Sequence, residues 1–201
     1  MVTTGFSRIH VAKYAESAGV VEYSEVRELA RARSMETDIT TTDNNDYYAN
    51  NQLAEQEPAA FSSGSASITV DGLSAEEEAF ILGIESEKRT INGKEVELIP
   101  YGADMKPPYV GIGAVKRQQL KGVVSYRAVI FTKARFAIPS EAAETQEGDG
   151  LTWQDQDLSA TLMPDDSGNR RWKYIPKTNF TTEEDAVNFI RGFLGGAENA
   201  S

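Results

Sequence analysis

The longest alternating segment of the chain, residues 123–139 (VVSYRAVIFTKARFAIP), constrains the fold more than any other feature. Side chains that recur at every second position share one face of a β-strand. The even-numbered residues from Val124 to Phe136 are therefore expected on one face, and the odd-numbered residues from Ser125 to Arg135 on the other. A strand this long must be paired along both edges or cover another subunit. The chain is expected to be built around a β-sheet.

Five other segments alternate in a similar way between clusters of turn residues. They predict strands at residues 5–14, 65–73, 108–117, 151–164 and 170–175. The turn at residues 165–169 predicts that the last two of these strands form a hairpin with each other. Residues 20–41 are ambiguous, because Glu25–Arg33 could form a helix on propensity alone.

Two short segments carry the signals of helix ends. Ser74 followed by Glu77 is a capping box, and Gly83 stands where such a helix would end. Thr181 followed by Glu184 makes a second capping box, which opens a predicted C-terminal helix.

The Gly195–Gly196 pair ends that second helix, and residues 195–201 are expected to fray. The predicted fold class is α+β, mainly β. It is an antiparallel β-sandwich or barrel-like domain spanning residues 1–201, with one short mid-chain helix and one C-terminal helix.

Two long polar stretches interrupt the pattern, at residues 40–62 and 85–108. Loops of this length in a compact domain are usually functional or disordered. The neighbouring Tyr47 and Tyr48 suggest that the first loop docks on a partner, although a passive surface loop is the alternative. Asn92-Gly93 predicts a hairpin turn within the second stretch.

Composition argues against most catalytic classes. The chain has no cysteine and one histidine, His10, so neither a triad nor a Cys/His metal set can be assembled. Gly111 and Gly113 lie within a predicted strand, where they indicate close backbone packing rather than a dinucleotide fingerprint. No catalytic, cofactor-binding or metal-binding residue is assigned. No apolar run predicts a signal peptide or a membrane anchor, which favours synthesis in a cytoplasm.

Charge is unevenly distributed in this acidic chain, whose net charge is −11. Such a chain is a poor nucleic-acid binder but could form a surface along which DNA slides without sticking. The predicted strands at 108–117 and 123–139, with the turn between them, concentrate six basic residues: Lys116, Arg117, Lys121, Arg127, Lys133 and Arg135. Six acidic residues follow: Glu141, Glu144, Glu147, Asp149, Asp155 and Asp157.

This asymmetry suits head-to-tail self-association, and an internal ladder of cross-strand charge pairs explains it equally well. Asp155 and Asp157 share one face of a predicted strand. Such a pair could hold a cation or do acid–base work, but a solvated face is the simpler interpretation.

Taken together, five segments resemble the major tail protein family of long-tailed bacteriophages that infect Gram-positive bacteria. They are GFSRIHVAKY, SASITVDGLSAEEEAFILGI, PPYVGIGAV, the stretch from Tyr126 to Tyr174, and NFTTEEDAVNFIRGFLG. Each is weakly specific alone, and their succession along the chain carries the resemblance. Residues 40–62 and 85–106 do not match the family's pattern.

The resemblance implies a structural virion protein without enzymatic activity. Six copies would close into a ring, and rings would stack into a tail tube that encloses the tape-measure protein and later conducts DNA. Further partners would be the tail terminator and the baseplate or tail-tip proteins; assembly would occur in the host cytoplasm.

The expected subunit interface comprises Asp43, Asn44, Asn45, Asp46, Tyr47, Tyr48, Asn50, Asn51, Arg127, Lys133 and Arg135, and Asp155 and Asp157 are candidates for an acidic lumen or interface. The alternatives are a tail-terminator or connector protein that forms single rings, a monomeric ligand-binding β-sandwich that decorates a virion, and a small carboxylate hydrolase.

Overall fold

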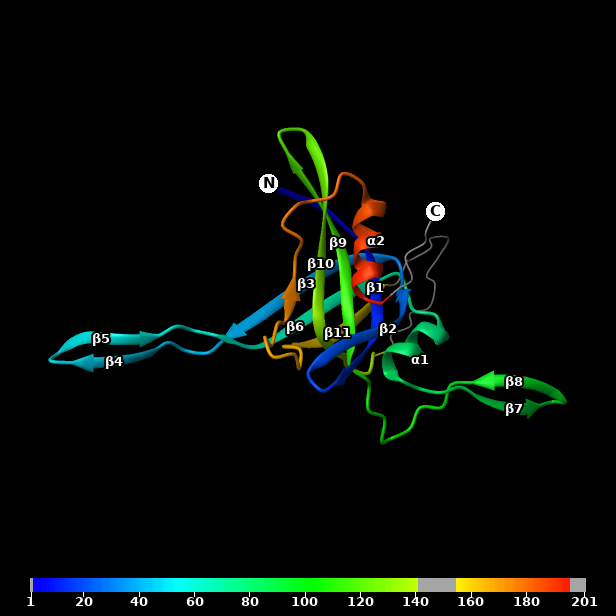
Figure 1. Ribbon diagram of the computed structural model, residues 1–201. Coiled ribbons are helices and arrows are strands. Elements are labelled where there is room, and N and C mark those ends of the chain that lie inside the picture. The colour runs from blue at the N-terminus through cyan, green and yellow to red at the C-terminus, as the bar shows by residue number, and fades with distance from the viewer. Residues whose placement is uncertain (1, 141–154, 196–201) are drawn as a thin grey trace, which may run out of the picture.

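The computed structural model describes residues 2–140 and 155–195. An antiparallel sheet of eight strands forms its body (Figure 1), in the order β2-β1-β9-β10-β11-β6-β3, with β12 paired to β10. The strands are β1 (Val2–Ser17), β2 (Val20–Glu28), β3 (Ala32–Thr41), β6 (Phe61–Val70), β9 (Val110–Leu120), β10 (Val123–Phe136), β11 (Gln156–Met163) and β12 (Lys173–Tyr174). The expected class, α+β and mainly β with a sandwich-like antiparallel arrangement, is confirmed.

Two apolar cores lie on opposite faces of this sheet. The larger core contains side chains from strands across the sheet, among them Ile112 of β9, Ile68 of β6 and Leu158 of β11. The smaller core lies between the sheet and helix α2 (Glu183–Phe193), where Ile130 meets Ile190. The central strands are therefore buried on both faces, and β9 and β10 contain the longest runs of buried residues.

Strand β10 does not keep one set of side chains on one face, contrary to the sequence prediction. Ala128 and Ile130 pack in the core beneath α2, whereas Ala134 and Phe136 pack in the larger core. The register between β10 and β9 shifts between Phe131 and Ala134. An irregularity of this kind inserts a residue and exchanges the two faces.

The predicted hairpin between residues 151–164 and 170–175 is also wrong. Strand β12 pairs with β10, placing Tyr174 opposite Ile130 and Lys173 opposite Phe131. Strand β11 pairs instead with β6 and with the end of β10. The strand β10 is thus paired along both edges within the chain, since Phe180 also bridges to Tyr126.

The first helix has the predicted ends. Helix α1 (Ala75–Leu82) begins after Ser74, which forms a reciprocal capping box with Glu77, and it ends at Gly83 in the left-handed conformation. Its residues Phe80, Ile81 and Leu82 are buried in the larger core.

The second helix begins one residue later than predicted. Thr182, not Thr181, accepts the backbone N–H of Asp185. Phe180 exchanges two backbone hydrogen bonds with Tyr126, so the chain stays extended as far as this cap. Helix α2 ends at Phe193 with Leu194 as its C-cap, and Gly195 with positive φ follows, where the sequence predicted the end.

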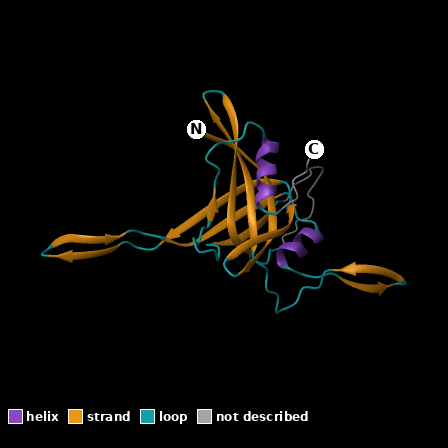
Figure 2. Cartoon of the chain, viewed as in Figure 1, coloured by secondary structure: helices purple, strands orange, loops and turns teal. Residues whose placement is uncertain are grey.

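Two ribbons project from the body on opposite sides (Figures 1 and 2). The first arm, residues 42–60, contains β4 (Asn45–Ala49) and β5 (Gln52–Glu57), where the sequence predicted a loop. The second arm, residues 85–99, contains β7 (Glu87–Ile91) and β8 (Lys94–Leu98), and it turns at Asn92-Gly93 as predicted. The ambiguous residues 20–41 form strands β2 and β3 rather than a helix.

Candidate assembly surfaces

The first arm is a continuation of strands β3 and β6 away from the body. Thr42 donates its backbone N–H to the carbonyl of Ala60 at 2.8 Å, which joins the two halves at the root. Asn50 and Asn51 both have positive φ and form the tip. Asn and Asp tolerate this left-handed conformation better than most residues, so they suit a two-residue hairpin turn.

Several of the expected interface residues hold the arm together. The Asn44 side-chain oxygen accepts the N–H of Ala59 at 2.8 Å, and Asp46 accepts from Gln56 at 2.7 Å. The residues Asp43, Asn45, Asn50 and Asn51 lie exposed on the same ribbon. Part of this polar sequence therefore encodes the ribbon itself, which sequence reasoning missed.

The arm exposes apolar side chains that contact neither core. Tyr47 and Tyr48 are 64% and 63% exposed, and Leu53, paired across the ribbon with Tyr48, is 51% exposed. An isolated two-stranded ribbon is at best marginally stable in water. These side chains are therefore available to a partner, and contact with one would stabilise the arm.

Two of the expected interface cations are engaged within the chain. Lys133 is buried and pairs with Asp166 at 2.5 Å, while its ammonium also lies 4.2 Å from the ring centre of Tyr109. Arg135 stacks over the same Tyr109 ring at 3.9 Å. The hydrogen bond from Lys133 is the main cause that lowers the pKa of Asp166.

The third expected cation, Arg127, lies in a cluster of positive charge. Lys116 is its direct partner across β9 and β10, and Lys173 belongs to the adjacent strand β12. None of the three forms an ion pair with any carboxylate in residues 2–140 and 155–195. Burial is the main cause that lowers the pKa of Lys173, and the charges of Lys116 and Arg127 lower it further.

The two candidate lumen carboxylates are bonded to neighbouring strands. Asp155 forms an ion pair with Arg33 at the start of β3, and Asp157 accepts a hydrogen bond from Thr69 at 2.7 Å. The acidic residues Glu141, Glu144, Glu147 and Asp149 lie outside the described residues.

His10 has a structural environment. Its ring is fully buried, Nδ1 donates to the carbonyl of Arg8 at 3.1 Å, and Nε2 accepts from Arg191 at 3.2 Å. Burial lowers the pKa of His10, which favours the neutral ring. The contact links β1 to α2.

Gly111 and Gly113 allow close packing, as predicted. A Cβ atom on Gly113 would lie 2.2 Å from Cγ2 of Ile190, and one on Gly111 would lie 2.7 Å from the Tyr23 ring. These glycines let helix α2 approach the sheet.

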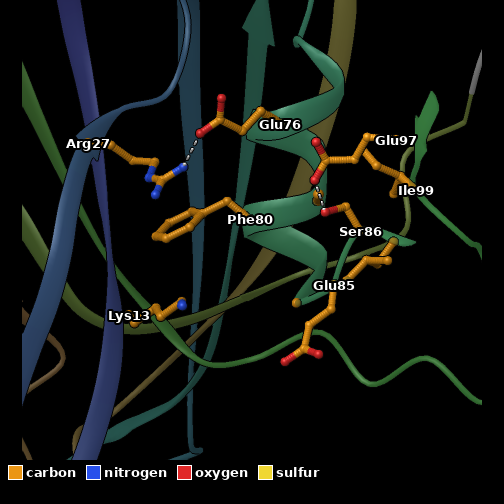
Figure 3. Close-up of a pocket in the computed structure, with 11 residues that line it drawn as sticks. Lys13, Arg27, Glu76, Phe80, Glu85, Ser86, Glu97 and Ile99 are labelled. Atoms are coloured by element: carbon orange, nitrogen blue, oxygen red, sulfur yellow. Dashed lines mark hydrogen bonds and ion pairs between the residues drawn. The ribbon is translucent and has the colours of Figure 1, made fainter. Parts of the chain in front are cut away.

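An open groove of about 620 Å³ lies between α1, the root of the second arm and strands β1 and β2 (Figure 3). Arg27 stacks over the Phe80 ring at 4.0 Å and pairs with Glu76 at 3.3 Å. Lys13, the other cation in the groove, pairs with Glu25 at 2.7 Å. Because both cations already have carboxylate partners, the groove offers neither of them unpaired to an anionic ligand.

Metal-binding clusters and membrane-spanning helices are absent from the described residues. No group of three His, Asp or Glu side chains converges as a possible metal site in residues 2–140 and 155–195. Within the same ranges, neither helix has the length and apolar character needed to cross a bilayer.

No protein-family model matches the chain, and no curated protein matches it either.

Proposed function

We propose that this chain is a structural subunit of a bacteriophage tail tube, which polymerises as stacked hexameric rings around the tape-measure protein and later conducts DNA. The observation that carries the proposal is the first arm, a two-stranded ribbon whose largest apolar side chains are more than half exposed and belong to neither core. The sequence resemblance described above supports the choice of family, and the arm supplies a physical reason to self-associate.

Burial of the arm's apolar side chains would contribute substantially to the free energy of association. Full burial of a large apolar side chain contributes about 1.5–3 kcal/mol. Tyr47, Tyr48 and Leu53 are each more than half exposed, so covering them would offset much of the entropy lost when an arm docks. Repetition around a closed ring multiplies this contribution.

The strand order also leaves edges that a neighbour could extend. Strands β2 and β3 end the main sheet, and each pairs with one strand only among the described residues. Edge strands of this kind are templates for pairing with another chain. Strand β3 runs directly into the first arm, so a copy bound along this edge would also meet the arm.

The net charge of −11 supports the transport half of the proposal. A tube built from acidic subunits repels phosphate and so avoids binding the DNA that passes through it. Asp157, exposed on β11, and Asp155 remain candidates for the lumen or for an interface. The tape-measure protein, the tail terminator and the tail-tip or baseplate proteins would be the other partners.

The proposal is tested by replacing both tyrosines, Tyr47→Ala with Tyr48→Ala. The purified variant and the parent are compared by negative-stain electron microscopy and sedimentation velocity at rising protein concentration. We expect rings or tubes from the parent and a concentration threshold raised at least about tenfold in the variant, which corresponds to about 1.4 kcal/mol per contact.

A matched control replaces two exposed isoleucines outside both arms, Ile138→Ala with Ile175→Ala. This control should assemble like the parent, and thermal unfolding of both variants should match that of the parent. A parent that remains monomeric at every concentration would contradict the tube. Unchanged assembly of the tyrosine variant would show that the arm is not part of the interface.

Single rings that never stack would favour the terminator or connector alternative. A monomer that binds a small ligand in the groove beside Phe80 would favour the decoration-module alternative.

A further inference from the structure

Lys116, Arg127 and Lys173 form a cluster of positive charge, here called the cationic mouth. In an isolated subunit the repulsion within this cluster is unfavourable. Lys116 and Arg127 are direct cross-strand partners, and like charges in this position are destabilising. All three side chains are partly buried. No described carboxylate neutralises them, although the chain carries 31 acidic residues against 20 basic ones.

The mouth is also preorganised. Asn179 accepts from the Arg127 Nε at 3.0 Å, and it donates to Gln118 at 3.1 Å and to Ser125 at 3.0 Å. Gln118 is buried, so this network fixes the guanidinium from the protein side. A fixed guanidinium loses little conformational entropy when it binds a carboxylate.

Aromatic rings lie beside the charges. The Lys173 ammonium lies 5.6 Å from the ring centre of Phe131 and 5.5 Å from that of Trp172. Trp172 stacks on Phe61 with ring centres 4.9 Å apart, and Phe61 begins strand β6 at the root of the first arm. The mouth therefore combines positive charge with an aromatic surface, close to where the arm leaves the body.

The first arm has the complementary composition. Residues 40–62 contain four acidic residues, Asp43, Asp46, Glu55 and Glu57, and no Lys or Arg. Glu55 and Glu57 are exposed and form no ion pair within residues 2–140 and 155–195. The same ribbon carries Tyr47 and Tyr48, whose rings suit cationic and aromatic neighbours.

The arm cannot reach the mouth of its own subunit while it stays extended. It runs straight away from the body (Figure 1), and the eight residue steps from Thr41 to Ala49 span roughly 26 Å at about 3.3 Å each. The root lies near the mouth and the acidic ribbon extends away from it. Any contact between the extended ribbon and a mouth would therefore join two subunits.

We propose that the cationic mouth formed by Lys116, Arg127 and Lys173 receives the acidic first arm of a second copy of this chain. The inference rests on the proposed function, because it names the surface on which the arm docks. It also explains how an acidic protein self-associates despite its net charge: the local surfaces that meet have opposite sign.

The test is a charge exchange in the full-length protein. One variant reverses the net charge of the mouth from +3 to −1, with Lys116→Glu and Arg127→Glu. Another reverses the net charge of the arm from −4 to +2, with Asp43→Lys, Glu55→Lys and Glu57→Lys. Each alone places like charges together, so each should raise the assembly threshold at least about tenfold. An equimolar mixture of the two should assemble near the parental threshold, because every arm then meets a mouth of opposite sign.

A single chain carrying all five substitutions should also regain assembly. A matched control with the same change in net charge as the mouth variant, Lys106→Glu with Lys177→Glu, alters two exposed lysines outside the mouth and should assemble like the parent. The arm variant changes only exposed residues, so it gives a valid result even if the mouth variant unfolds, which thermal unfolding would reveal.

The outcomes separate this inference from the proposed function. If the tyrosine variant fails to assemble while the arm variant assembles normally, the mouth is not the docking site and the tube proposal stands. Loss of assembly in both charge variants without rescue in the mixture also overturns the inference. Absence of any assembly by the parent overturns both.

Discussion

At the scale of single residues, the distance between helix α2 and the sheet is set by a missing side chain. Gly113 faces Ile190, and even one methyl group at this position would overlap the isoleucine. The backbone of β9 is fixed by pairing with β1 and β10 on its two edges. Neither surface can retreat easily, because a well-packed core resists added volume.

Replacing Gly113 by Ala is therefore expected to reduce the free energy of unfolding by about 1–3 kcal/mol, the usual cost of overpacking. Urea denaturation measures this change. Gly168→Ala is the matched control, because a Cβ atom there meets nothing within 4 Å. Equal stability of the two variants would show that α2 moves away from the sheet without cost.

The environments of single residues were only partly predictable from sequence. The close packing at Gly111 and Gly113 followed from glycines inside an apolar strand. The engagement of Lys133 did not, because its partner Asp166 lies 33 residues away and reaches it only through the fold. A sequence pattern shows that a cation sits on a strand, but the distant carboxylate decides whether that cation is free.

At the scale of elements, prediction succeeded where the determining interactions are local. The capping box that starts α1, the glycine that ends it and the Asn92-Gly93 turn of the second arm each involve residues close in sequence. Such signals act through neighbouring backbone groups, so they can be recognised from the local sequence, although the capping box at Thr181 placed the start of α2 one residue too early. They located three element boundaries correctly.

Prediction failed where pairing between distant segments determines the partner or the orientation of a strand. The strand β12 follows a turn after β11, yet it pairs with β10, which comes earlier in the chain. The exchange of faces within β10 depends on its register against β9. The first arm is a ribbon of polar residues without apolar alternation, so its pattern gave no strand signal.

The start of α2 allows a direct comparison of prediction and structure. Thr182→Ala should lower the free energy of unfolding by about 1 kcal/mol, because the hydroxyl that accepts the Asp185 N–H is lost. Thr181→Ala removes the same atoms from the neighbouring residue and should have a smaller effect. Denaturant unfolding of both variants shows which threonine caps the helix. A larger loss of unfolding free energy in Thr181→Ala than in Thr182→Ala would support the sequence prediction instead.

At the scale of the whole molecule, the body and the arms are energetically distinct. Residues 42–60 and 85–99 contribute no fully buried side chain to either core. Several of the large exposed apolar side chains, including Tyr47, Tyr48, Leu53, Ile91 and Val96, project on these arms. A protein that folded only for its own stability would gain little from them.

Replacing residues 43–59 by a two-residue Asn-Gly turn should therefore leave the free energy of unfolding within about 0.5 kcal/mol of the parent. The same change should abolish assembly, as measured by sedimentation velocity. The corresponding turn across β3 and β6 preserves the bond between Thr42 and Ala60. A loss of several kcal/mol would instead make the arm part of the folding unit.

The two arms leave the body on opposite sides and differ in charge, since the second arm carries Lys88, Arg89 and Lys94 among its acids and the first carries no base (Figure 1). Any filament in which one arm seats on the next copy has two unlike ends. At one end a new copy would bind an exposed arm, and at the other end it would bind an exposed mouth. A copy with a mouth but no arm could join such a filament and leave no arm for its successor, so a minority of truncated copies would stop growth at that end.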